Sequence, residues 1–139
     1  MKFYYFDVLK EYDYQLSGKS VFTTSAHLIK ALNVSLDRIL MRGVPFIIDL
    51  CKSNSEFLRQ SLLFDFERFR KDEGNAVTVF KYSKSIELVK QCYNRDVVVG
   101  SGVRELRDTT FRIATFGWAL SVASLTEACN TIREVAKTL

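Results

Sequence analysis

Apolar residues recur at helical spacing over most of this chain, and this recurrence constrains the fold more than any other feature. The clearest case is the last segment, where one stripe of apolar residues falls on a single helix face. Its members are Leu125, Ala128, Ile132, Val135, Ala136 and Leu139. Ser124 and Glu127 have the spacing of a capping box at the start of this stripe. The sequence therefore predicts a helix over residues 124–139.

A second apolar stripe crosses the middle of the chain. Pro45, the only proline, is suited to the first position of a helix, where its missing N–H costs nothing. Apolar residues continue at helical spacing over residues 47–69, and Gly74 is a natural stop. The polar run at 53–55 interrupts the stripe, so we expect it to divide this stretch into two helices.

Shorter elements surround these helices. Residues 76–82 and 96–99 are β-branched runs that predict short strands, with a helix around residues 86–92 between them. The apolar residues of segment 2–16 fit both the alternation of a strand and the spacing of a helix, and we favour a strand at the start of the segment.

The fold class that these elements predict is mainly α, a bundle-like helical domain with a few short strands, and α+β is the alternative. No linker rich in Pro, Gly or Ser is present, so residues 1–139 are expected to form a single domain.

The composition adds a prediction about surfaces. Hydrophobic residues make up 47% of the chain and aromatic residues 13%, more aromatic surface than a small core readily encloses. We therefore expect an aromatic-rich helical face that binds a second copy or another protein. The residues assigned to this interface are Phe57, Phe64, Phe66 and Phe69.

Charge and cysteine content point to an ordinary cytoplasmic protein. The 20 basic and 16 acidic residues leave a net charge of only +4, which permits nucleic-acid binding without indicating it. Cys51, Cys92 and Cys129 are far apart, and the chain has only one histidine, His27, that could join them as a metal ligand. No metal ion and no cofactor is therefore predicted. No apolar run is long enough for a membrane span and no signal peptide is evident.

Catalytic patterns are scarce. His27 is the only imidazole, and no serine or cysteine has a nucleophile-elbow setting. The turn Gly100-Ser101-Gly102 follows a β-branched run and could hold an anion at a helix start, but it lacks the third glycine of a dinucleotide site and the Lys of a P-loop. The ordinary reading is a tight turn. We therefore predict that the chain is not an enzyme.

One local pattern suggests an alternative function. Residues 24–43 read as two short helices joined at Asn33, and they resemble the helix-turn-helix of repressor-type DNA-binding domains. This resemblance implies that Ser35, Arg38 and Arg42 face phosphates or base edges. Two short amphipathic helices without any DNA contact explain the same pattern. The first functional hypothesis is thus a regulatory or protein-interaction domain that self-associates, and the second is a DNA-binding regulator.

Overall fold

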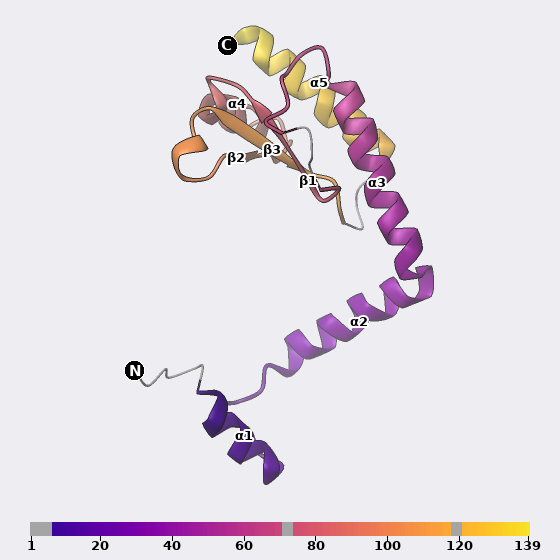
Figure 1. The fold of residues 1–139 in the computed structure, drawn as a ribbon, viewed down its shortest axis with the longest axis vertical. Helices are drawn as coiled ribbons and strands as arrows, with labels where there is room; N and C mark the ends of the chain where they lie inside the picture. Colours follow the sequence, from indigo (N-terminus) through magenta and orange to yellow (C-terminus); the bar gives the residue numbers. More distant parts are fainter. Residues whose placement is uncertain (1–6, 71–73, 118–120) are drawn as a thin grey trace. The chain divides into compact units, whose positions relative to one another are not determined.

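The computed structural model describes residues 7–70, 74–117 and 121–139, which fall into two compact units, 1–43 and 44–139 (Figure 1). The first unit contains helices α1 (Val8–Leu16) and α2 (Ala26–Arg42). The second contains α3 (Val44–Ser61), β1 (Val77–Lys81), α4 (Ser85–Tyr93), β2 (Gly100–Ser101), the 3-10 turn η1 (Arg104–Leu106), β3 (Thr110–Ala114) and α5 (Val122–Thr138).

Helix α1 occupies the described part of residues 2–16, the segment that fitted both a strand and a helix period. The strand favoured at the start of this segment falls mainly on residues 1–6, which lie outside the described chain. Asp7 caps the helix, because its carboxylate accepts a hydrogen bond from the backbone N–H of Lys10 at 3.1 Å. The Glu11 carboxylate then accepts the backbone N–H of Val21 at 3.3 Å, which ties the following loop to the helix. No described residue of α1 is buried.

Helix α2 is continuous through the position where a helix-turn-helix needs its turn, so that motif is not formed. Asn33 donates from its side chain to Asp37 at 3.4 Å, and the Ser35 hydroxyl donates to the Ala31 carbonyl at 3.0 Å. Both side chains find partners one turn away, and neither ends the helix. The helix stops at Gly43, whose φ of 84° suits glycine.

Helix α3 is likewise unbroken across residues 53–55, where a break was expected. Asn54 and Ser55 are buried, and the Ser55 hydroxyl lies within hydrogen-bonding distance of both the Lys52 carbonyl and the Asn75 side chain. Asn54 and Ser55 therefore lie on a packed face of the helix, and the Ser55 hydroxyl has partners in the helix itself and in the segment before β1.

The sheet is antiparallel throughout, in the order β1-β3-β2. The middle strand, β3, was not predicted, and the strand expected at 96–99 is not formed; β2 begins directly after it, at Gly100. Residues 67–69 add a further partial edge, since Phe69 donates its N–H to Val79 and Lys81 donates to the Glu67 carbonyl.

Helices α3, α4 and α5 contribute to one core cluster with one face of this sheet. Phe66, Phe80 and Phe111 form its aromatic centre, with ring centroids 5.1 to 6.3 Å apart. The other fully buried members include Leu58, Leu62, Leu88, Cys92, Ile132 and Val135. Each such large side chain contributes roughly 1.5–3 kcal/mol by leaving water, so this cluster holds the second unit together.

The predicted fold class is confirmed: the chain is mostly helical, with one small three-stranded antiparallel sheet. The expected strand at 76–82, the helix at 86–92 and the last helix are all present. Helix α5 begins earlier than expected, because Ser121 and Ser124 form the capping box in place of Ser124 and Glu127. That residues 1–139 form a single domain stays a prediction.

Candidate functional site

The sheet has a second, open face, and Arg112 is its most prominent polar residue. On β3, Phe111 and Ile113 point into the core, so the alternating residues Arg112 and Ala114 point away from it and are exposed. Val79 on β1 and Gly100 on β2 are the cross-strand partners of Arg112. Among the described residues, no hydrogen bond or ion pair holds its guanidinium. A carboxylate or phosphate could therefore bind this group through two parallel hydrogen bonds.

Gly100 allows the Arg112 side chain to lie across the sheet. A Cβ at position 100 would stand 2.8 Å from Arg112 Nε and 3.0 Å from its Cγ. Glycine at this strand position thus leaves room for the arginine stem over β2.

Gly102 meets a different constraint, because a Cβ there would be 2.1 Å from the Leu106 carbonyl oxygen. Both glycines approach protein atoms, and residues 100–101 form a strand that leads only into a three-residue 3-10 turn. The strand–turn–helix setting considered for an anion site is absent, which leaves the ordinary reading of these glycines.

Described residues line two of the cavities on the second unit. One has a volume of about 430 Å³ and lies between the ends of β3 and α5; the other, of about 300 Å³, lies beside α3. The first is lined by Asp96, Val97, Val98, Val99, Ile113, Ala114, Phe116, Gly117, Ser124, Leu125, Glu127 and Ala128. The second is lined by Glu56, Arg59, Gln60, Leu63 and Arg68. Neither contains a lysine. Within the described ranges no group of three His, Cys, Asp or Glu side chains could hold a metal ion.

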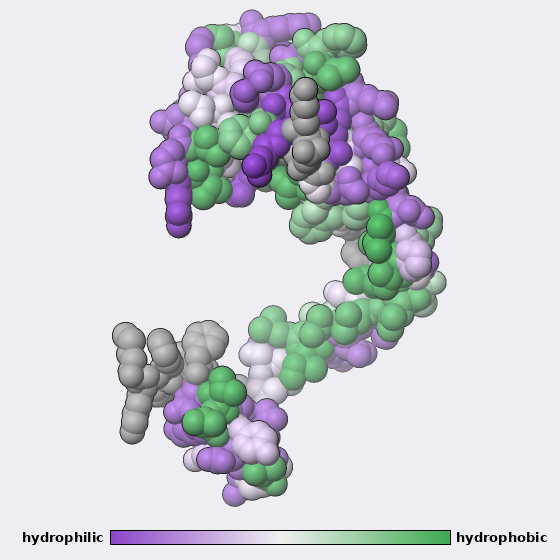
Figure 2. All heavy atoms as spheres, viewed as in Figure 1, coloured by the Kyte–Doolittle hydropathy of each residue, from purple (hydrophilic) through white to green (hydrophobic). Residues whose placement is uncertain are grey.

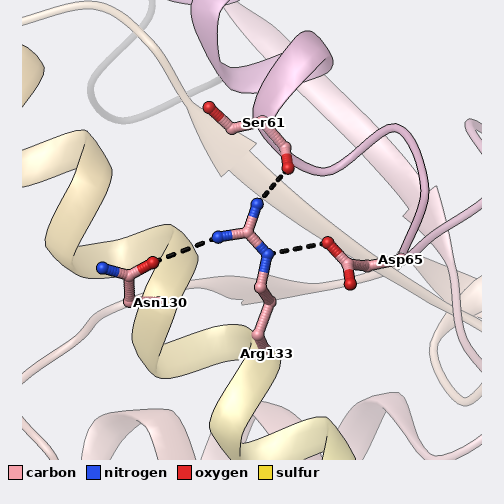
Figure 3. A network of polar contacts seen from close by, with 4 residues as sticks. All are labelled: Ser61, Asp65, Asn130 and Arg133. Carbon is pink, nitrogen blue, oxygen red and sulfur yellow. Dashed lines mark hydrogen bonds and ion pairs between the residues drawn. The ribbon is translucent and has the colours of Figure 1, made fainter.

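A polar network joins α5 to the end of α3 (Figure 3). Arg133 Nε donates to Asp65 Oδ2 at 2.7 Å, and Nη1 donates to Asn130 Oδ1 at 3.1 Å. Its remaining Nη donates to the carbonyl of Ser61, the last residue of α3. A helix leaves its last carbonyls without intrahelical partners, so Arg133 caps α3 from a neighbouring helix. The network is structural, because every part of the guanidinium is engaged.

The three cysteines are free thiols, and the buried Cys92 and Cys129 are not poised for nucleophilic chemistry. Burial raises the pKa of the Cys92 and Cys129 thiols, and the nearby Arg133 only partly offsets this for Cys129. A raised pKa keeps a thiol protonated and unreactive at neutral pH. His27, the only imidazole, is exposed on α2.

The residues assigned to DNA contact lie on one continuous helix and not on a recognition helix that follows a turn. Ser35, Arg38 and Arg42 all lie exposed on the single helix α2, and their assigned role required the turn that is missing.

The four phenylalanines assigned to an interface do not share an environment. Phe66 is 5% exposed in the core, Phe57 is half-buried, Phe69 is 37% exposed and Phe64 is 96% exposed. A contact role for Phe64 stays a prediction.

Arg112 was not identified from the sequence. Its signal was the alternation of Phe111 and Ile113 on either side of a charged residue, which is typical of a strand with one buried face. The alternation is only five residues long and follows a charged stretch, which is too short a pattern to indicate a strand by itself.

Comparison with known proteins gives a consistent likeness. No family model matches the chain. An uncharacterized aminotransferase of Methanocaldococcus jannaschii is 31% identical over 125 residues, covering 82% of this chain and 32% of that protein. An aspartate aminotransferase of subgroup IV from Thermus thermophilus superposes with a TM-score of 0.76 at 20% identity, covering 99% of this chain and 40% of its own. An alanine–glyoxylate aminotransferase from Nostoc sp. superposes with a TM-score of 0.77 at 18% identity, covering 82% of this chain and 32% of its own.

These matches correct the functional predictions. The likeness in sequence and fold is to aminotransferases, so the predictions of a non-enzymatic interaction domain and of a DNA-binding regulator are wrong. The chain spans about a third of the length of the curated relative. None of the helices in the described residues combines the length and apolar character that a bilayer crossing requires.

Proposed function

We propose that this chain is part of an aminotransferase, an enzyme that transfers an amino group between an amino acid and a 2-oxo acid. The observation that carries the proposal is the 31% identity to the Methanocaldococcus jannaschii aminotransferase over 125 residues. The fold supports it independently, since 99% of the chain superposes on part of the Thermus thermophilus enzyme. Aminotransferases are typically homodimers, so the expected self-association is assigned here to the assembled enzyme.

Aminotransferases use pyridoxal phosphate, which needs a lysine for its Schiff base and donors for its phosphate. The described residues do not fit this group by themselves. Neither cavity contains a lysine, and the two glycines at 100 and 102 approach protein atoms instead of forming a phosphate cradle. The chain corresponds to a third of the curated relative, and we assign the cofactor's main contacts to the remainder of the enzyme.

The contribution that this chain can make is recognition of the substrate's carboxylate by Arg112. Every α-amino acid and every 2-oxo acid carries a carboxylate next to the reacting carbon. The Arg112 guanidinium is exposed on the open face of the sheet, without a described partner, and its stem is placed over Gly100. A planar guanidinium binds a carboxylate in one orientation, which positions the substrate as well as holding it.

The test is a chimeric enzyme in which this chain replaces the matching segment of the Methanocaldococcus jannaschii relative. Transamination is measured with aspartate and alanine as donors and with 2-oxoglutarate and glyoxylate as acceptors. We expect activity, and we expect Arg112→Gln to lower kcat/KM by roughly 10- to 100-fold, because one charge-assisted contact is lost. Arg112→Lys should recover only part of that loss, since an ammonium cannot form the two-pronged contact.

The control variant is Arg104→Gln, an exposed arginine on η1 that lies outside the strands. It should leave kcat/KM within about 2-fold of the unmodified chimera. A folded chimera with no transaminase activity, while the parent enzyme is active, would refute the proposed function. Equal kinetics for Arg112→Gln and Arg104→Gln would refute the role of Arg112 alone.

A further inference from the structure

The larger of the two cavities lies next to Arg112. Ala114 lines this cavity of about 430 Å³, and it lies two residues after Arg112 on the same face of β3, about 7 Å further along the strand. The Arg112 stem lies over Gly100 on β2, and Val99, directly before Gly100, lines the cavity from that side. All of the described residues that line the cavity belong to the second unit, so its place beside Arg112 does not depend on residues 1–43.

The walls of this cavity are mostly apolar. Val99, Ile113 and Leu125 line it with side chains that are buried in the second unit, and they come from the segment before β2, from β3 and from α5. Val98 and Phe116 add two further apolar side chains. Figure 2 shows that hydrophobic residues reach the surface of the second unit between hydrophilic ones. An apolar group that fills the cavity gains free energy, because its own surface and that of these side chains leave water.

The ionisable side chains at this cavity are both acidic. Asp96 precedes β2, and Glu127 lies on α5. Among the described residues that line the cavity there is no lysine, arginine or histidine, and none of the ion pairs between described residues includes either carboxylate. An acidic side chain of a ligand would therefore meet two like charges and no counter-charge, which disfavours its binding.

The likeness to aminotransferases leaves the side chain of the substrate open. One of the solved enzymes of this fold is named for aspartate, an acidic amino donor, and another for alanine, whose side chain is a methyl group. A cavity of about 430 Å³ has the volume of a small-molecule pocket, far more than a methyl group fills. The cavity beside Arg112 thus favours a side chain that is uncharged and larger than a methyl group.

We infer that this cavity holds the side chain of an apolar α-amino acid larger than alanine, such as norvaline or leucine, while Arg112 holds its carboxylate; the inference rests on the proposed function. The carboxylate and the side chain of an amino acid leave the same carbon atom, so a carboxylate on Arg112 brings the side chain to a neighbouring position on the sheet. Ala114 is that position, and its methyl group leaves room for the ligand. Asp96 and Glu127 are specificity-determining residues, because they disfavour an acidic donor.

The test compares amino donors in the chimeric enzyme, with glyoxylate as the acceptor because it has no side chain. We expect kcat/KM to be at least about 5-fold higher for leucine than for alanine, and lower for aspartate than for either. Ala114→Leu should lower the leucine-to-alanine ratio of kcat/KM by at least about 10-fold, since the new side chain fills part of the cavity. The control is Val77→Leu, opposite Ala114 on β1 and outside the cavity, which should leave this ratio within about 2-fold. Equal ratios in the two variants, or an unmodified chimera that prefers aspartate or alanine to leucine, would overturn the inference.

The charge argument has its own variant, Asp96→Asn with Glu127→Gln. It should raise the aspartate-to-alanine ratio of kcat/KM by at least about 5-fold, because the like charges are removed. Asparagine tolerates the positive φ of 61° at position 96. The matched control, Glu105→Gln with Asp108→Asn, removes two exposed carboxylates that do not line the cavity and should leave the ratio within about 2-fold. The same ratio in both double variants would refute the role of the two cavity carboxylates.

The chain alone provides a readout that does not need transaminase activity. At about 10 mM, 4-methyl-2-oxopentanoate, the 2-oxo acid of leucine, should shift the NMR methyl signals of Ala114 and Leu125, and oxaloacetate, the 2-oxo acid of aspartate, should shift them markedly less. No shift, or equal shifts with both compounds, would contradict the preference of the cavity for an apolar side chain. Selective shifts together with an inactive chimera would leave that preference established and would count against the proposed function only.

Discussion

Replacing Arg133 with methionine should lower the free energy of unfolding of the second unit by about 2 kcal/mol. Methionine keeps an apolar stem of similar length but removes every donor of the guanidinium. Three contacts are lost, to the Ser61 carbonyl, the Asp65 carboxylate and the Asn130 amide. These contacts contribute different amounts to the free energy of unfolding, and the more exposed contacts contribute less.

The ion pair is the weaker part of this sum. The side chains of Arg133 and Asp65 are 30% and 33% exposed, so solvent screening limits their attraction to about 0–1 kcal/mol. The bond to the Ser61 carbonyl is charge-assisted and part-buried, and it contributes roughly 1–2 kcal/mol because this carbonyl has no other described hydrogen-bond donor. Asp65→Asn should therefore cost at most about 1 kcal/mol, clearly less than Arg133→Met.

Urea unfolding followed by circular dichroism measures these differences, with Lys81→Met as the matched control. The Lys81–Glu67 pair is also short, at 2.6 Å, but its side chains are 46% and 72% exposed. Its loss should cost no more than about 0.5 kcal/mol. If Arg133→Met were no more destabilising than Lys81→Met, the argument that Arg133 caps α3 would be refuted.

Two further outcomes follow from other parts of the chain. Gly102→Ala should lower the free energy of unfolding in urea by about 2 kcal/mol, because the new Cβ would lie 2.1 Å from the Leu106 carbonyl oxygen. Gly74→Ala is the control, because its Cβ would meet nothing within 4 Å and the change should be nearly neutral. Equal effects of the two variants would contradict this argument. The hydrogen bond from Gln15 lowers the pKa of Glu11, so the carboxyl's stabilising contribution is fully present above its ordinary pKa and is lost as pH falls through the lowered value. An NMR titration should find a midpoint below 4.5 that rises in Gln15→Ala, and a midpoint at or above 4.5 in the unmodified chain would disprove the assignment.

The candidate site at Arg112 could not be predicted from local sequence motifs. The residues singled out for chemistry were those with a recognised motif around them, namely the glycine turn and the residues 24–43. Arg112 has no motif, and its importance depends on lying in the middle strand with its side chain on the uncovered face. That position depends on pairing with β1, more than thirty residues earlier in the chain, which no local pattern records.

The sequence by itself determined the elements whose signals are local. Helices α4 and α5 and strand β1 were predicted because an apolar period and a capping residue act within a few positions of each other. The mainly helical class followed from the same signals.

Only the tertiary structure decided the continuity of α2 and α3, the middle strand β3 and the exposure of each apolar face. Asn33 and Ser55 are helix-ending residues in many contexts, yet here each has a partner that keeps the helix intact. The apolar residues of α2 read in the sequence as an ordinary core face, and only the structure shows that the described residues of the first unit do not bury them. The physical reason is that periodicity fixes which side of a helix is apolar, whereas burial depends on what lies opposite it.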